Sequence, residues 1–145
     1  MLAQSEAQSR ALWRIRESIP EAQFTNVKHD VSVPVSRTPE LIELAGQALA
    51  KAYPQAQPYV FGHVGDGNLH YNVGPESLVR ERAAVNRIVY DAVARLDGSI
   101  SAEHGLGQLK REEILRHKSP VEMELMRSLK QALDPAGLMN PGKVL

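Results

Sequence analysis

The sequence predicts an α+β fold in which an antiparallel sheet carries helices on one face. Residues 26–33 alternate between apolar and polar side chains, as in a half-buried strand, and Pro34 ends this pattern. Residues 58–63 and 69–73 indicate the two strands of a β-hairpin, joined by a glycine-rich turn. Elsewhere, apolar residues recur every three or four positions over long stretches, which indicates amphipathic helices.

Two helices flank the alternating strand. The first is predicted over residues 5–19, close to Pro20. The second has Thr38 as its predicted N-cap and Pro39 in its first turn, and it continues until Pro54.

The longest helical pattern spans residues 76–96, and Gly98 suits its C-terminal cap. Its apolar stripe is predicted to belong to the core rather than to a cofactor site: Val85, Ile88, Val89, Ala92, Val93 and Leu96. Two shorter helices are predicted over residues 108–117 and 120–133, before an irregular tail. Ser119 opens the second of these with a capping box.

Residues 99–103 predict one further short strand. Counted from residue 26, the order is therefore strand, helix, strand, strand, helix, strand. This is the ferredoxin-like βαββαβ arrangement, a four-stranded antiparallel sheet with helices on one face, here followed by additional C-terminal helices. At 145 residues, the sequence is expected to form a single domain.

Composition excludes several classes of function. Lys and Arg total 17, as do Asp and Glu, so no net charge favours nucleic acid or an anionic membrane. No apolar run approaches the ~20 residues that span a bilayer. The absence of cysteine excludes disulfides, thiol catalysis and thiolate metal sites, which leaves histidine and carboxylate as the ligands for a metal.

The glycine-rich stretch Phe61–Val73 carries half of a predicted polar site. If Asp66 and Gly67 are the central residues of a type I′ turn, His63 pairs directly with His70. Directly opposed residues share a face, with Cβ atoms about 4.5–5.5 Å apart. The same register pairs Gly65 with Asn68 and Val64 with Leu69.

Two imidazoles held in this way can bind one divalent metal at about 2.0–2.1 Å. Asn72 lies two residues beyond His70 and is expected to point to the same face. The alternative is a surface hairpin with two unconnected histidines. A dinucleotide-binding loop is disfavoured, because the glycines run G-x-x-G-x-G and no long helix follows them directly.

Glu103 and His104 offer the other half of the site. Glu103 is a candidate third ligand, and His104 is a candidate general base because imidazole takes up a proton near neutral pH. Adjacent strand residues point to opposite faces, so both reach one site only if the strand ends there, and Gly105 permits such a break. The alternative is polar surface before a loop. Lys28, on the polar side of its strand, either binds an anion or is solvated.

Five blocks of sequence occur in one order along nearly the whole chain. They are Leu12–Glu17 (LWRIRE), Lys28–Pro34 (KHDVSVP), Gly62–His70 (GHVGDGNLH), Glu103–Gly107 (EHGLG) and Asp134–Lys143 (DPAGLMNPGK). Together they resemble the C-terminal domain of FAD-linked 2-hydroxy-acid dehydrogenases of the vanillyl-alcohol-oxidase type. This group includes D-2-hydroxyglutarate and D-lactate dehydrogenases and the glycolate oxidase flavin subunit.

The resemblance implies a metal-assisted oxidation. It implies that His63, His70 and Glu103 bind a divalent metal, zinc or manganese, and that His104 removes the proton of the substrate hydroxyl. FAD is the implied hydride acceptor, bound mainly by a domain that these 145 residues do not contain.

The resemblance also implies the substrate contacts. Arg16 and Lys28 match positions that hold substrate carboxylates, and Asn72 matches a nearby contact. Two such cations together with Asn72 are most similar to the D-2-hydroxyglutarate branch. Pro20 stands where that branch carries a threonine that contacts the substrate, so D-malate, D-lactate and glycolate stay open.

The expected partners are a small 2-hydroxy acid and a flavin-binding domain or subunit, with an electron acceptor that the sequence does not specify. We expect the chain to hold metal, to lack FAD and turnover when alone, and to self-associate through apolar surface. A cytoplasmic location is expected, with any association with an inner membrane made through a partner. The alternatives are a stand-alone metal- or anion-binding module without redox activity, and a structural domain with a decayed site.

Overall fold

The computed structural model describes residues 2–63 and 65–145. The chain divides into two compact units, Met1–Ile100 and Ser101–Leu145. Helices and an antiparallel sheet occur together, which confirms the predicted α+β fold. The single-domain organisation stays a prediction. Within the described residues, no helix has the length and apolarity needed to cross a bilayer.

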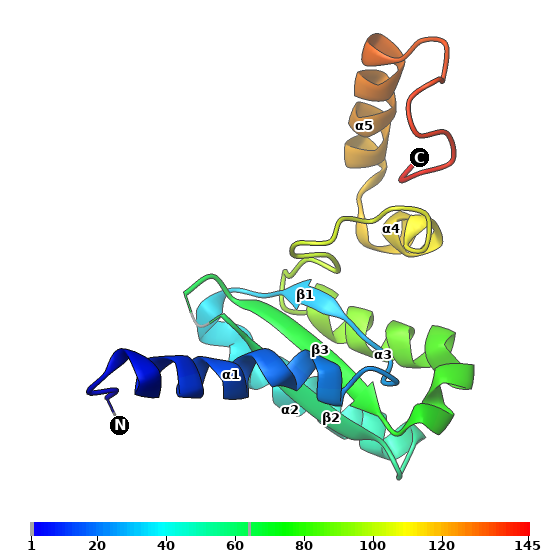
Figure 1. Ribbon diagram of the computed structural model, residues 1–145. Helices are drawn as coiled ribbons and strands as arrows, with labels where there is room; N and C mark the ends of the chain where they lie inside the picture. The colour runs from blue at the N-terminus through cyan, green and yellow to red at the C-terminus, as the bar shows by residue number, and fades with distance from the viewer. Residues whose placement is uncertain (1, 64) are drawn as a thin grey trace. The chain divides into compact units, whose positions relative to one another are not determined.

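The first unit is built on a three-stranded antiparallel sheet (Figure 1). Its strands are β1 (Asp30–Ser32), β2 (Gln57–His63) and β3 (Asn68–Gly74), in the spatial order β1-β3-β2. The predicted fourth strand is reduced to a single antiparallel bridge between Ser99 and Ser32, so the expectation of a four-stranded sheet was wrong.

The fourth strand is short because the chain bends soon after the bridge. The Ser101 hydroxyl donates a hydrogen bond to the Gly105 carbonyl at 2.8 Å, and Gly105 has a φ of 71°. The bridge nevertheless lies beside β1, which is the place of the last strand in a βαββαβ sheet.

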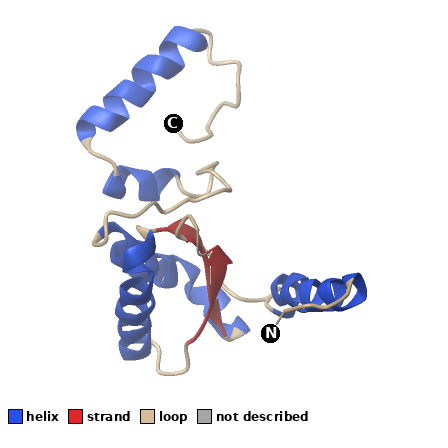
Figure 2. Cartoon of the chain, turned by 90° about the vertical axis from the view of Figure 1, so that its left-hand side faces the viewer, coloured by secondary structure: helices blue, strands red, loops and turns tan. Residues whose placement is uncertain are grey.

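Two helices cover one side of the sheet, α2 (Thr38–Ala52) and α3 (Arg82–Ala94), and α1 (Glu6–Ala22) lies on the other side (Figures 1 and 2). The predicted alternation is confirmed, since every second residue from Val27 to Val33 is buried. The core of the unit is formed by Val27, Val31, Val33, Leu41, Ala45, Leu49, Leu69, Tyr71, Val73, Leu78, Val85, Val89, Tyr90, Ala92, Val93, Leu96 and Ile100.

The helix boundaries differ from the prediction in ways that local contacts explain. α1 follows Ser5, whose side chain accepts a hydrogen bond from the Gln8 amide, and it continues past Pro20 to Ala22. Thr38 is not an N-cap but the first residue of α2. The short 3₁₀ helix η1 (Val35–Arg37) leads directly into α2 and occupies the capping position.

The predicted helix over residues 76–96 consists of the 3₁₀ helix η2 (Glu76–Glu81) followed by α3. Its apolar stripe is buried as predicted, except for the half-buried Ile88. Gly98 is not a left-handed cap, because the positive φ (55°) belongs to Asp97. Gly98 is required by space instead, since a Cβ there would lie 2.3 Å from the Ser32 carbonyl oxygen.

The second unit contains α4 (Arg111–His117) and α5 (Pro120–Leu133). The predicted capping box of α5 is confirmed, because Ser119 and Glu122 each accept a hydrogen bond from the other's backbone amide. Hydrogen bonds from Lys118 and then from Ser119 lower the pKa of Glu122 to about 2. The tail after α5 contains no helix or strand, as predicted.

Candidate substrate and metal site on the polar face of the sheet

The strands of the first unit direct a second set of side chains away from α2 and α3. Asp30 pairs with His70, and His70 pairs with Phe61. Directly paired residues share a face and every second residue returns to it, so three strands contribute to one surface, which we call the polar face. Its members are Lys28, Asp30, Ser32, Tyr59, Phe61, His63, Asn68, His70 and Asn72.

The hairpin register differs from the predicted one. His63 pairs with Asn68 rather than with His70, and the two histidines are therefore diagonal neighbours on the polar face. The predicted pairing of Gly65 with Asn68 is wrong for the same reason. Val64, predicted to pair with Leu69, lies outside the described residues, and Leu69 pairs with Gly62.

The turn explains this register. Of the two predicted central residues, only Gly67 has a positive φ (71°), so the turn is not of type I′. The Asp66 carboxylate accepts a hydrogen bond from the Asn68 amide at 3.0 Å, which closes an Asx turn instead. The loop is therefore longer than two residues, and pairing begins at His63 and Asn68.

Two glycines of the motif are required by close approach of the backbone. A Cβ on Gly62 would lie 2.1 Å from the Asn68 carbonyl oxygen, and one on Gly67 would lie 2.0 Å from the Val33 carbonyl oxygen. Gly65 has open space around the same position. Gly62 thus allows close approach of the two hairpin strands, and Gly67 allows the turn to lie against Val33, which follows β1.

The diagonal arrangement of His63 and His70 fits a divalent metal. Diagonal neighbours in a sheet lie about 7–8 Å apart, with Cβ atoms somewhat closer, which leaves room for one ion about 2.0–2.1 Å from each ring nitrogen. His63 is exposed and His70 is half-buried, so solvent reaches both side chains. Asp30 adds a carboxylate opposite His70. Imidazole and carboxylate are ligands that suit zinc and manganese.

Three contacts connect α1 and the turn after it to the polar face. The Arg16 guanidinium lies over the Phe61 ring, 5.9 Å from its centroid, and the Lys28 ammonium lies 5.2 Å from the centroid of Phe24. The Asn72 side-chain amide donates a hydrogen bond to the side-chain oxygen Oε1 of Gln23 at 2.8 Å.

The first unit therefore collects five of the predicted site residues on or beside one sheet face: Arg16, Lys28, His63, His70 and Asn72. Glu103 and His104 belong to the second unit, where both side chains are exposed in the bend before Gly105. The predicted end of the strand before Gly105 is present, which is the condition for both side chains to reach one site. Their roles as metal ligand and base stay predictions.

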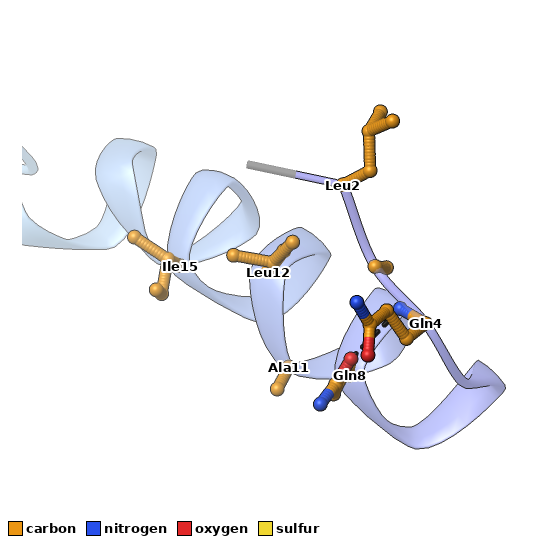
Figure 3. Close-up of a pocket in the computed structure, with 7 residues that line it drawn as sticks. Leu2, Gln4, Gln8, Ala11, Leu12 and Ile15 are labelled. Atoms are coloured by element: carbon orange, nitrogen blue, oxygen red, sulfur yellow. Dashed lines mark hydrogen bonds between the residues drawn. The ribbon is translucent and has the colours of Figure 1, made fainter.

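A hollow elsewhere on the first unit lacks side chains that could act in catalysis or bind a metal. It lies along the first half of α1 and is lined by Leu2, Gln4, Gln8, Ala11, Leu12 and Ile15, together with Ala3 (Figure 3). None of these side chains titrates or carries a charge, so neither acid–base nor metal chemistry is available there.

Comparison with known proteins agrees with the motifs on the polar face. The family described as FAD linked oxidases, C-terminal domain, matches residues 1–144. The chain belongs to this family. A D-2-hydroxyglutarate dehydrogenase of Stutzerimonas stutzeri is 40% identical over 99% of the chain and 33% of its own length. One of Xanthomonas citri is 42% identical over 99% of the chain and 32% of its length.

A mitochondrial D-2-hydroxyglutarate dehydrogenase of Bos taurus is 41% identical over 99% of the chain and 27% of its own length. The chain thus spans about a third or less of the relatives it matches.

Several residues on or beside the polar face do not stand out in the sequence. Phe61, Phe24 and Gln23 contact the candidate cations and amide, and Asp30 lies opposite His70. Phe61 and Asp30 follow from strand alternation, because each lies two residues from a candidate. Phe24 and Gln23 lie in the turn after α1, and no pattern in the sequence marks them.

Proposed function

We propose that this chain is the substrate- and metal-binding catalytic portion of an FAD-dependent dehydrogenase. The proposed reaction oxidises a D-2-hydroxy acid, most similar to D-2-hydroxyglutarate, to the 2-oxo acid. The observation that carries the proposal is the gathering of two imidazoles, two cations and an amide on or beside one sheet face. The names of the relatives and the family support it.

The two cations are suited to a dicarboxylate. Arg16 presents a planar fork that can hold one carboxylate through two hydrogen bonds, and Lys28 presents a point charge from another direction. Asn72, on β3, contributes a polar contact to the substrate. Such a pair of cations favours a substrate with two carboxylates over D-lactate or glycolate, which have one.

His104 is the proposed base. It takes the proton of the substrate hydroxyl on a ring nitrogen, while the hydrogen on the same carbon departs with its electron pair and leaves a 2-oxo acid. His63, His70 and Glu103 are the residues that would hold zinc or manganese, which acidifies a hydroxyl as a Lewis acid. FAD, held mainly by a domain outside this chain, would supply the two-electron acceptor.

The first test is the metal content of the purified chain, measured by elemental analysis. We expect about one equivalent in the parent chain and its loss in His63→Ala and in His70→Ala, because each variant removes one of two ligands from a single hairpin. His117→Ala removes a histidine of α4 in the second unit and should retain the metal. Absence of metal from the parent after zinc or manganese is added would contradict the hairpin-centred site.

The same chain separates the substrate alternatives. Calorimetric binding should be tighter for D-2-hydroxyglutarate than for D-lactate or glycolate. Metal binding without discrimination between one and two carboxylates would favour the D-lactate or glycolate branch. Metal binding without any affinity for hydroxy acids would favour a stand-alone metal-binding module.

A further inference from the structure

We infer that Phe61 is a positioning residue that orients both Arg16 and His70 through one aromatic ring. The inference rests on the proposed function, because it concerns a cation proposed for substrate and an imidazole proposed for metal. It adds a residue to which neither the motifs nor the relatives' names assign a role.

Phe61 contacts the two candidates at once. His70 lies on the neighbouring strand β3, and its ring centroid is 5.0 Å from that of Phe61, with the ring planes tilted by 36°. From α1, the Arg16 guanidinium lies over the same ring at 5.9 Å. Both distances are within the ranges in which rings attract each other and attract cations. Phe61 and His70 also pair directly across the sheet, so the backbone fixes the ring beside the imidazole.

Arg16 depends on this contact more than a side chain within the sheet would. α1 contains no buried residue, so apolar packing contributes little to fixing the side chains along it. A guanidinium that lies over a ring keeps its edge free to donate to a carboxylate in the plane of the fork. The ring therefore restricts Arg16 without occupying the groups that bind substrate.

The same argument applies to the imidazole. A metal-binding histidine must present a nitrogen in a fixed direction, and contacts around the ring set that direction. The Phe61 ring, with its centroid 5.0 Å from that of His70, limits rotation of the imidazole. Loss of the ring should thus weaken two kinds of binding that depend on different atoms.

Phe24 offers a matched comparison. Its ring also lies under a candidate cation, Lys28 at 5.2 Å, but it is 79% exposed and comes from the turn after α1 rather than from the sheet. Phe24 should therefore affect carboxylate binding alone, whereas Phe61 should affect both carboxylate and metal.

The experiment uses the full chain and three variants, Phe61→Leu, Phe61→Tyr and Phe24→Leu. Zinc affinity is measured by competition with a chelator, and D-2-hydroxyglutarate affinity is measured separately on metal-free chain. We expect Phe61→Leu to lower both affinities about two- to fivefold, the size of an exposed cation–π contact. Phe61→Tyr keeps the ring and should stay within about twofold of the parent. Phe24→Leu should lower hydroxy-acid affinity and leave zinc affinity unchanged.

A readout that needs no ligand separates this inference from the proposed function. The order parameter of the Arg16 Nε–H bond, from ¹⁵N relaxation, should fall in Phe61→Leu and be kept in Phe61→Tyr. A parent chain that binds neither zinc nor hydroxy acid would contradict the proposed function, and the order parameter would still test the positioning of Arg16.

Two results would overturn the inference. The first is equal order parameters and equal affinities in Phe61→Leu and the parent. The second is a Phe61→Tyr variant as defective as Phe61→Leu, which would show that the site depends on packing volume at residue 61 rather than on the ring. Urea unfolding of each variant shows whether the chain is folded when these values are compared.

Discussion

The two faces of one sheet are stabilised in different ways. On the buried face, alternate residues of β1 and β3 pack against α2 and α3, and residues such as Val31 and Val73 have no exposed surface. On the polar face, α1 contributes no buried residue, and α1 and the turn after it contact the sheet through aromatic rings and an amide. The alternation of a strand therefore separates the residues that stabilise the fold from those available for binding.

The difference in energy follows from the kind of contact. Burying a leucine stabilises a protein by about 1.5–3 kcal/mol, whereas an exposed cation–π contact contributes about 0.5–1 kcal/mol. The cation–π contacts of the polar face can therefore be lost without unfolding the unit. The buried face has no such freedom.

The largest expected effect is on the buried side. Leu49 of α2 has no exposed surface, and Leu49→Ala should lower the free energy of unfolding by about 2–5 kcal/mol because a cavity is left in the core. Ile15 of α1 is 68% exposed, and Ile15→Ala should change it by no more than about 0.5 kcal/mol. Urea unfolding followed by circular dichroism measures both. A comparable loss in Ile15→Ala would show that α1 is buried in solution and would break the comparison of the two faces.

Substitutions in the turn that joins β2 to β3 should have the next largest effect on the free energy of unfolding. Gly67→Ala puts a Cβ at a φ of 71° and 2.0 Å from the Val33 carbonyl oxygen, so we expect a loss of about 2–4 kcal/mol. Gly65→Ala is the matched control in the same loop. A Cβ there meets no atom within 4 Å, and the stability should be unchanged or raised by up to about 1 kcal/mol. Equal effects of the two substitutions would contradict the assigned turn.

Much of the buried face could be predicted from the sequence. The alternation from Val27 to Val33 has the period of a strand, and one buried face is enough to fix which side chains point inward. The capping box at Ser119 was equally predictable, because its two hydrogen bonds lie within one helical turn.

The polar face was predictable in membership but not in geometry. The pairing of His63 depended on the turn type, and the Asx turn at Asp66 changed the register by two residues. A shift of two residues keeps each side chain on its face, so His63 and His70 remained together although their pairing was wrong. Contacts from the turn after α1, such as Gln23 with Asn72, depend on tertiary packing that no local pattern specifies.

The smallest expected effect concerns a polar group on the buried face. Tyr71 is fully buried, and its hydroxyl has no hydrogen-bond partner among the described residues. Tyr71→Phe should therefore leave the free energy of unfolding near neutral pH unchanged or slightly higher, because a buried hydroxyl without a partner does not stabilise the fold. Tyr59→Phe, which changes an exposed tyrosine, is the control.

The pH dependence gives Tyr71 a sharper signature. Burial raises the pKa of Tyr71 to about 12, above the value of about 10 in an unfolded chain. The unfolded chain thus releases its proton first, so the stability contributed by the neutral phenol is complete below pH 10 and is lost as the pH rises from about 10 to 12. Between pH 9 and pH 11 the parent should lose about 1 kcal/mol that Tyr71→Phe does not lose, measured by urea unfolding across this range. A parent and a Tyr71→Phe variant with the same alkaline slope would show that the Tyr71 hydroxyl reaches solvent, and the buried face would then be less closed than its apolar neighbours indicate.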